Sequence, residues 1–88
     1  MVIKEGFVLR ELGGQYVVVA LGEASKHFNG VIHLNETGAF LFKILSKETT
    51  KEEMVKALLD EYDVTEEKAS EDVLNFINKL KEAKLLNE

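Results

Sequence analysis

Cysteine and proline are both absent from these 88 residues. Without cysteine the chain has no disulfide, no thiol nucleophile, and no zinc or iron–sulfur site built on thiolate. A small chain without disulfides is typical of a reducing compartment, so we expect a cytoplasmic protein. The longest apolar run, residues 16–21, is far shorter than the roughly 20 residues that cross a membrane. The first residues also lack the apolar stretch of a signal peptide, so we expect no membrane partner.

Basic side chains are in the minority, since 11 Lys and Arg stand against 16 Asp and Glu, for a net charge of −5. Residues 1–34 carry the two signs in equal number, so the excess lies in residues 35–88. An acidic surface repels polyanions, so we expect no nucleic acid as a partner. With 45% hydrophobic residues, the chain can still form one modest core, and we expect residues 1–88 to be a single domain.

The composition changes near residue 34, from Val, Gly and aromatic residues to Glu, Lys, Leu and Ala. This order predicts strands followed by helices in an α+β fold. Two apolar runs, residues 7–12 and 15–21, flank Gly13-Gly14, which is a hairpin signal because two-residue turns need positive φ. A loop of residues 22–30 then leads to a short third strand at residues 31–34.

Three helices are predicted after the strands. Asn35 is a good N-cap for a helix that runs to about Lys47 and is apolar all round, which is typical of a buried helix. Thr50 has capping-box spacing to Glu53, and Thr65 begins a last helix that runs to about Lys84. That helix has a core stripe made of Ala69, Val73, Phe76, Ile77 and Leu80. A three-stranded antiparallel sheet followed by three helices, the last two a helix–turn–helix pair, predicts a winged helix-turn-helix-like fold.

No arrangement typical of catalysis is present. His27 and His33 have no carboxylate at ligand spacing, which makes a metal site a poor interpretation. The chain has no glycine-rich phosphate loop and no serine in a nucleophile elbow. Acidic pairs such as Glu66-Glu67 fit solvated first turns of helices. We therefore expect a binding module with no enzyme activity, no cofactor and no metal.

A helix–turn–helix also suggests DNA binding. A recognition helix reads bases with its N-terminal residues and needs Lys and Arg beside the phosphates. Here that end is acidic, with four carboxylates set against Lys68, and Arg10 is the single arginine of the chain. This favours a protein-binding role over a DNA-binding regulator. Both the regulator and a subunit that binds another protein without a peptide ligand remain alternatives.

The predicted third strand, Val31-Ile32-His33-Leu34, is short enough to be a sheet edge. Edge strands leave backbone N–H and C=O groups unpaired, and an extended peptide can dock there as an added strand. The last helix would wall the resulting groove, with Leu74, Ile77 and Lys81 as candidate wall residues. The same edge could pair with a second copy, so a homodimer is a further expectation. The alternative is that this edge is solvated and binds no peptide, and that Leu74 is an ordinary exposed leucine.

One segment resembles a known family. Residues 34–42 read L-N-x-T-G-A and run into an aromatic-rich helix; Tyr62-Asp63-Val64 and the pattern D-V-x-x-F-I-x-x-L at residues 72–80 follow. These motifs, over about residues 31–86, resemble the PqqD family. The chain departs from the family at Lys84, where members often have glycine before a final Leu-Leu, and in the loop of residues 22–30.

The resemblance implies a winged helix–turn–helix recognition element without catalytic activity. Such an element binds the leader of a ribosomally made precursor peptide as an extra strand beside the third strand. It presents that leader to a maturation enzyme, often a radical S-adenosylmethionine enzyme, whose iron–sulfur chemistry belongs to the partner. Synthesis of pyrroloquinoline quinone itself does not follow from the resemblance.

On matching positions, the resemblance places peptide binding on the third strand and on the last helix, where Val73 and Leu80 are expected to pack beneath the groove. Asn35, Thr37 and Gly38 are expected to be structural, as a cap and a close backbone approach. With Leu74 added from the groove argument, the predicted peptide-binding residues are Val31, Ile32, His33, Leu34, Asp72, Leu74, Phe76, Ile77 and Lys81.

Overall fold

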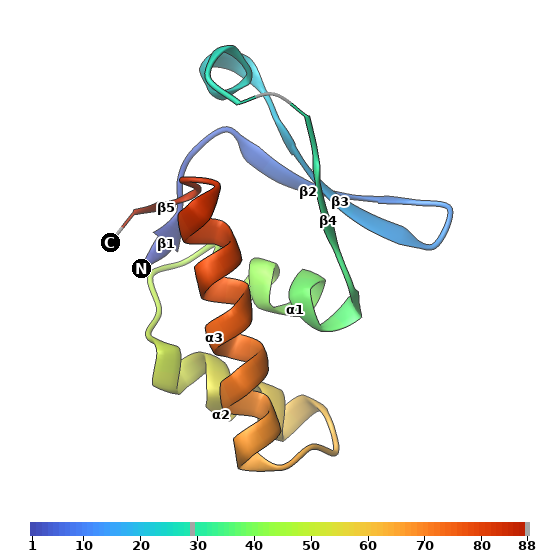
Figure 1. The fold of residues 1–88 in the computed structure, drawn as a ribbon, viewed down its shortest axis with the longest axis vertical. Coiled ribbons are helices and arrows are strands. Elements are labelled where there is room, and N and C mark those ends of the chain that lie inside the picture. Colours follow the sequence, from blue (N-terminus) through green and yellow to red (C-terminus); the bar gives the residue numbers. More distant parts are fainter. Residues whose placement is uncertain (29, 88) are drawn as a thin grey trace.

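The computed structural model describes residues 1–28 and 30–87 (Figure 1). The elements in chain order are β1 (Val2–Ile3), β2 (Phe7–Leu12), β3 (Gln15–Ala20), the 3-10 helix η1 (Gly22–Lys26), β4 (Ile32–Leu34), α1 (Glu36–Ile44), α2 (Lys51–Glu61), α3 (Glu66–Glu82) and β5 (Leu86–Asn87). The predicted α+β order, a three-stranded antiparallel sheet followed by three helices, is confirmed.

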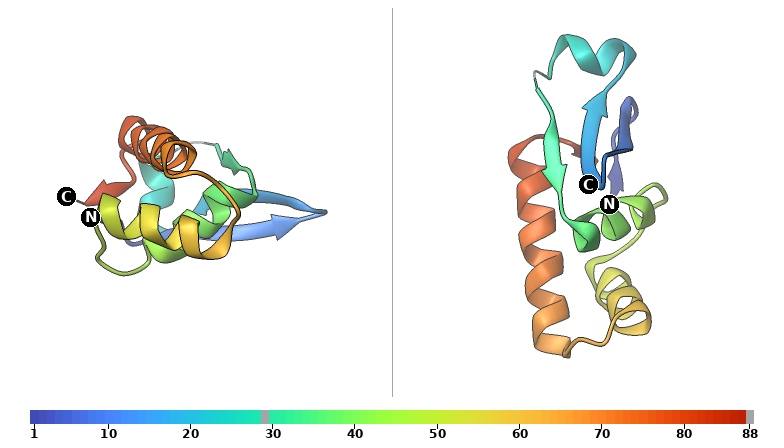
Figure 2. Two further views of the ribbon diagram at one scale, coloured as in Figure 1. Left: turned by 90° about the horizontal axis from the view of Figure 1, so that it is seen from below. Right: turned by 90° about the vertical axis from the view of Figure 1, so that its right-hand side faces the viewer.

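The main sheet has the strand order β2-β3-β4, with both pairs antiparallel. Gly13 and Gly14 form the predicted tight turn, and their φ values of 58° and 82° are those that such a turn requires. β3 is central, so β4 pairs with it along one side and has its other side at the sheet edge. Figure 2 shows the hairpin of β2 and β3 projecting beyond the helices.

A second small sheet was not predicted. β1 pairs antiparallel with β5, so the two ends of the described chain lie side by side. Backbone bonds hold β1 in place, because Ile3 N–H donates to the Leu45 carbonyl at 2.9 Å and Lys4 N–H donates to the Leu85 carbonyl at 2.8 Å. These strands of two residues depend on contacts between distant segments, which no local pattern reveals.

Several predicted boundaries need correction. β3 ends at Ala20 and β4 begins at Ile32, so each strand is one residue shorter than predicted. The first helix ends at Ile44 instead of Lys47, because Ser46 and Lys47 make tighter i→i+3 bonds to the carbonyls of Lys43 and Ile44. The loop of residues 22–30 contains η1, and its Asn29 lies outside the described residues. α3 ends at Glu82, before Lys84 turns the backbone to a positive φ of 62°.

The core lies between one face of the sheet and the helices. α1 sits between the sheet and α2 (Figure 1). It buries Leu41 and Phe42, its C-cap Leu45 is also buried, and Lys43 is exposed. The predicted α3 stripe is confirmed, since all five of its residues are buried. Within the described residues, no helix has the length and apolar character needed to span a bilayer.

Candidate functional site

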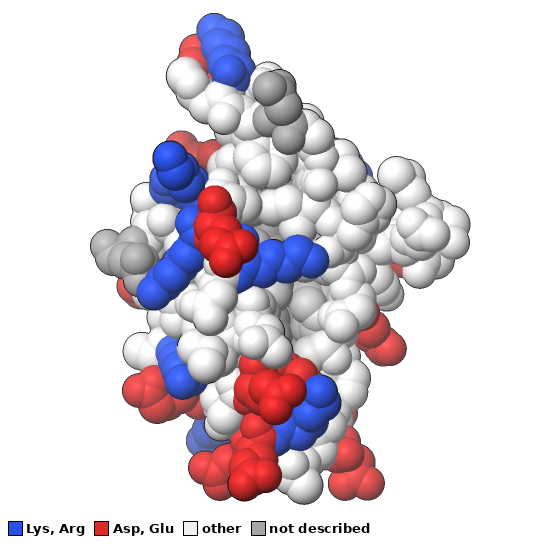
Figure 3. Space-filling view, in the orientation of Figure 1, with Lys and Arg blue, Asp and Glu red and all other residues white. Residues whose placement is uncertain are grey.

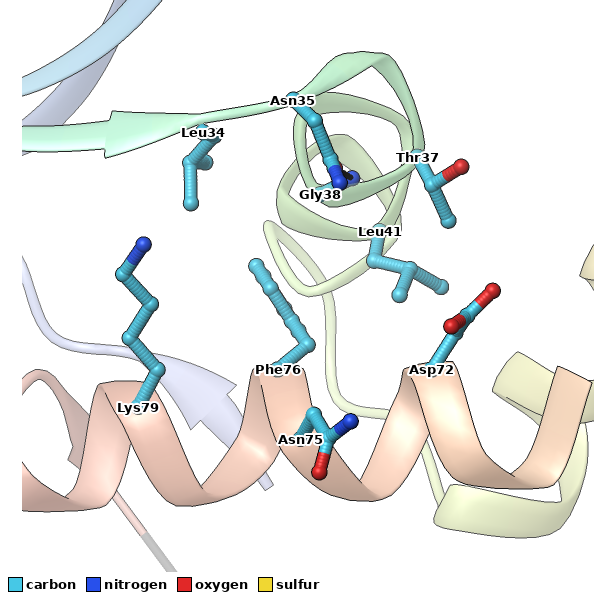
Figure 4. A pocket seen from close by; sticks show the side chains of 9 residues that line it. All are labelled: Leu34, Asn35, Thr37, Gly38, Leu41, Asp72, Asn75, Phe76 and Lys79. Carbon is cyan, nitrogen blue, oxygen red and sulfur yellow. Dashed lines mark hydrogen bonds between the residues drawn. The ribbon is translucent and has the colours of Figure 1, made fainter. Parts of the chain in front are cut away.

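A groove of about 230 Å³ lies where β4 meets α1, with α3 along its other side (Figure 4). Three elements supply its walls: β4 and α1 follow one another in the sequence, and α3 lies far from both. The lining residues are Leu34, Asn35, Thr37, Gly38, Leu41, Asp72, Asn75, Phe76 and Lys79. The fold therefore brings the free edge of the sheet and one face of α3 to the same hollow.

The α1 side of the groove is a tight, capped turn. Asn35 is the N-cap, and its Oδ1 accepts a hydrogen bond from Gly38 N–H at 2.7 Å. A Cβ on Gly38 would lie 3.2 Å from that oxygen and 3.3 Å from the Leu34 Cβ. Both residues thus have the structural roles expected of them, and they let the chain pass from β4 into α1 in one step.

On the α3 side, Asp72, Asn75, Phe76 and Lys79 follow one another at helical spacing, so they form a single stripe. Phe76 is only 6% exposed and belongs to both the groove and the core. Together with Leu34 and Leu41, it gives the groove an apolar floor. Asn75 and Lys79 are exposed, so the rim is polar.

The two ends of the groove carry opposite charges. Near the start of α1, Asp72 forms an ion pair with Lys68 at 3.0 Å. The hydrogen bond to Asp72 and its negative charge raise the pKa of the Lys68 ammonium above its ordinary value. This end therefore holds a carboxylate whose charge is partly neutralised by the Lys68 ammonium. At the other end, Lys79 Nζ donates to the backbone carbonyl of His33 at 2.7 Å.

The Lys79 contact shows which backbone groups of β4 face the open edge. The His33 carbonyl points toward α3, away from β3. In an antiparallel strand the N–H and C=O of one residue point to the same side, and neighbouring residues alternate. The N–H of His33 therefore also faces the edge, while Ile32 and Leu34 direct their groups toward their β3 partners Val18 and Tyr16.

Three of the nine predicted site residues line the groove, and three others lie in β4 or directly before it. Leu34, Asp72 and Phe76 line the groove. His33 supplies the edge groups, and Ile32, only 9% exposed, packs in the core beneath. Val31 is 49% exposed and comes directly before β4.

The other three predicted residues, Leu74, Ile77 and Lys81, are absent from the lining. At 100° per residue they project from the side of α3 opposite to the stripe that starts at Asp72. Leu74 is 45% exposed, whereas Ile77 is 5% exposed and belongs to the core. These three residues do not wall this groove, and their contact with a peptide stays a prediction.

Six lining residues were not predicted to bind a peptide: Asn35, Thr37 and Gly38, which were expected to be structural, and Leu41, Asn75 and Lys79. The signal for the last two was present, because they lie three and seven residues after Asp72, which was predicted. Among residues 1–28 and 30–87, no three His, Asp or Glu side chains are grouped so that they could hold a metal ion. The site is thus an apolar hollow with polar ends, next to a strand edge.

Two solved structures share this fold. One is described as "TbiB1 in Complex with the TbiA(beta) Leader Peptide": at 23% identity it has a TM-score of 0.75, with 99% of this chain and 95% of that chain covered. The other is described as "Lasso peptide synthetase B1 complexed with the leader peptide": at 17% identity it has a TM-score of 0.72, with coverages of 98% and 95%. A search among curated proteins found no match. The sequence model of the family described as "Coenzyme PQQ synthesis protein D (PqqD)" matches residues 8–86, and this chain therefore belongs to the PqqD family.

Proposed function

We propose that this chain is a non-catalytic recognition element that binds the leader of a ribosomally made precursor peptide as an added strand along β4. The observation that carries the proposal is the open edge at His33, which faces the groove lined by α3. Membership of the PqqD family supports a peptide-binding role. So does the shared fold of two proteins whose structures were solved with leader peptides.

Binding of this kind needs no bond chemistry. The N–H and C=O of His33 pair with one leader residue, and the floor of Leu34, Leu41 and Phe76 accepts an apolar side chain. Backbone pairing supplies affinity and the floor fixes the register. A leader held in this way raises the effective concentration of the attached substrate at an enzyme bound to the same complex.

The partner enzyme that we propose is a maturase of the radical S-adenosylmethionine type, which would carry its own iron–sulfur cluster. The proposed compartment is the cytoplasm, where ribosomal precursor peptides are made, and the proposed functional unit is the single domain of residues 1–88. A homodimer through β4 would use the same His33 groups as the leader. Self-pairing would therefore compete with leader binding.

A proline at position 33 tests strand addition. The His33 N–H is directed away from β3, so His33→Pro removes a donor that the sheet does not use, and proline is tolerated at such edges. We expect His33→Pro to weaken binding of the leader of a short peptide encoded beside this gene by about tenfold or more. His33→Ala keeps the N–H and serves as the matched control, with affinity near that of the wild type. Amide chemical shifts of labelled protein report both the affinity and the fold.

A second arm leaves the protein unchanged. Leader peptides with single N-methylated residues lack one backbone donor each, and strand addition predicts that alternate positions are sensitive. Shift changes should gather on residues 31–34 and 72–79. Sensitivity without this alternation, or a folded His33→Pro variant that binds like the wild type, would contradict strand addition at β4.

A further inference from the structure

The charges of the groove lining form a simple pattern. Asp72 and Lys79 are separated by seven residues of α3, which corresponds to about 10 Å along the helix axis. Between them lies the apolar floor, with Phe76 near the midpoint (Figure 4). An extended ligand in this groove therefore meets a carboxylate, then apolar surface, and then an ammonium group.

Both charged groups have partners that a ligand can replace. Lys68, which pairs with Asp72, has a side chain that is 58% exposed, and exposed ion pairs exchange at little cost. Lys79 donates to the His33 carbonyl, which is the acceptor that an added strand must use. When a leader N–H takes over this carbonyl, Lys79 is released directly beside the new strand.

The direction of the ligand follows from the direction of β4. Figure 4 shows β4 running from the Lys79 end toward the start of α1, where Asp72 lies. Antiparallel pairing is the more stable arrangement, so an added strand begins near Asp72 and ends near Lys79. Alternate residues of a strand share one face, and residues four apart are about 13 Å from one another. This distance is larger than the spacing of about 10 Å between Asp72 and Lys79 along α3, and the long side chain of Lys79 can span the difference.

We propose that this groove selects leaders that carry, from N- to C-terminus, a basic residue, an apolar residue and an acidic residue at alternate positions. The basic residue faces Asp72, the apolar residue rests on Phe76, and the acidic residue faces Lys79. This inference rests on the proposed function and adds to it the chemical class of leader that the site accepts.

A displayed library of random peptides, each about nine residues long, provides the probe. Selection on the wild-type protein should enrich the pattern basic–x–apolar–x–acidic. Reversing the sign of either charge in an enriched peptide should weaken binding about three- to tenfold. The double variant Asp72→Lys/Lys79→Asp should enrich the reversed pattern, acidic–x–apolar–x–basic. A matched swap on α2, Glu52→Lys/Lys56→Glu, exchanges two exposed charges away from the groove and should leave the wild-type pattern unchanged.

The outcomes separate this inference from the proposed function. If the folded wild-type protein enriches no peptide, the proposed function fails and the inference fails with it. If peptides are enriched and compete with the leader but show no charge order, or show the opposite order, only the inference is overturned. The inference alone is also overturned if Asp72→Lys/Lys79→Asp enriches peptides with the same charge order as the wild-type protein.

Discussion

Lys84 occupies a backbone conformation that suits glycine. It follows the C-cap of α3 with a φ of 62°, the left-handed region that L-residues rarely adopt. Two bonds define the turn, from Leu85 N–H to the Leu80 carbonyl and from Lys84 N–H to the Lys81 carbonyl, both 3.0 Å. This is the Schellman arrangement, and Leu80 and Leu85, both fully buried, make its usual apolar contact. Lys84, which stands where family members often have glycine, therefore holds a strained backbone conformation.

Lys84→Gly should stabilise the protein. A non-glycine residue in the left-handed region costs about 1–2 kcal/mol, and the larger backbone entropy of glycine offsets part of the gain. We expect a net increase of about 1 kcal/mol in the free energy of unfolding, with a Tm about 5 °C higher by calorimetry. Lys84→Ala removes the same charge but keeps the positive φ, so its Tm should stay near that of the wild type. An equal increase in Tm in both variants would show that loss of the lysine charge, and not relief of backbone strain, causes the effect.

At the scale of elements, local signals predicted the helix starts and the core stripe of α3, but not which flank of that stripe borders β4. Asn35, Thr50 and Thr65 each cap the helix predicted for them, because a cap is formed by residues three apart in sequence. Which face of α3 borders β4 depends on how the helix packs on α1, and this placed Lys79 instead of Lys81 at the groove. The pairing of β1 with β5 likewise depends on segments at opposite ends of the chain.

The capping box at the start of α2 predicts how a substitution of Thr50 changes the stability of the protein. Glu53 N–H donates to Thr50 Oγ1 at 3.1 Å, and Thr50 N–H donates to Glu53 Oε1 at 3.2 Å. Thr50→Ala should lower the free energy of unfolding by about 1 kcal/mol and the Tm by about 5 °C, whereas Thr50→Ser should retain most of the stability. Leader affinity should not change, since α2 contributes no residue to the groove lining. A loss of affinity in folded Thr50→Ala would show that the groove depends on this cap.

For the whole molecule, the distribution of charge decides between peptide and DNA as ligand. Figure 3 shows that charged side chains gather over the helices, while the surface over the sheet, at the right, is mostly uncharged. The first turns of α3, which would read bases in a DNA-binding relative, expose Glu66, Glu67 and Glu71. These carboxylates would repel phosphate groups.

We therefore expect no electrophoretic shift of duplex DNA at low salt, where phosphate contacts bind most strongly. The triple variant Glu66→Lys/Glu67→Lys/Glu71→Lys should bind DNA weakly and without sequence preference, which verifies that the assay can detect binding. A clear shift with the wild-type chain would favour the DNA-binding regulator that the helix–turn–helix suggests.

The pairing of β1 with β5 has a consequence for how this unit can be built into larger proteins. Val2 lies opposite Asn87, and Figure 1 places β1 and β5 on the far side of α3 from the free edge of β4. Chain ends that lie side by side favour domain insertion and circular permutation. The whole unit can thus be carried within a surface loop of another protein, with both connections leaving from one place. A permuted chain opened between Gly13 and Gly14, at an exposed turn, would keep the groove intact.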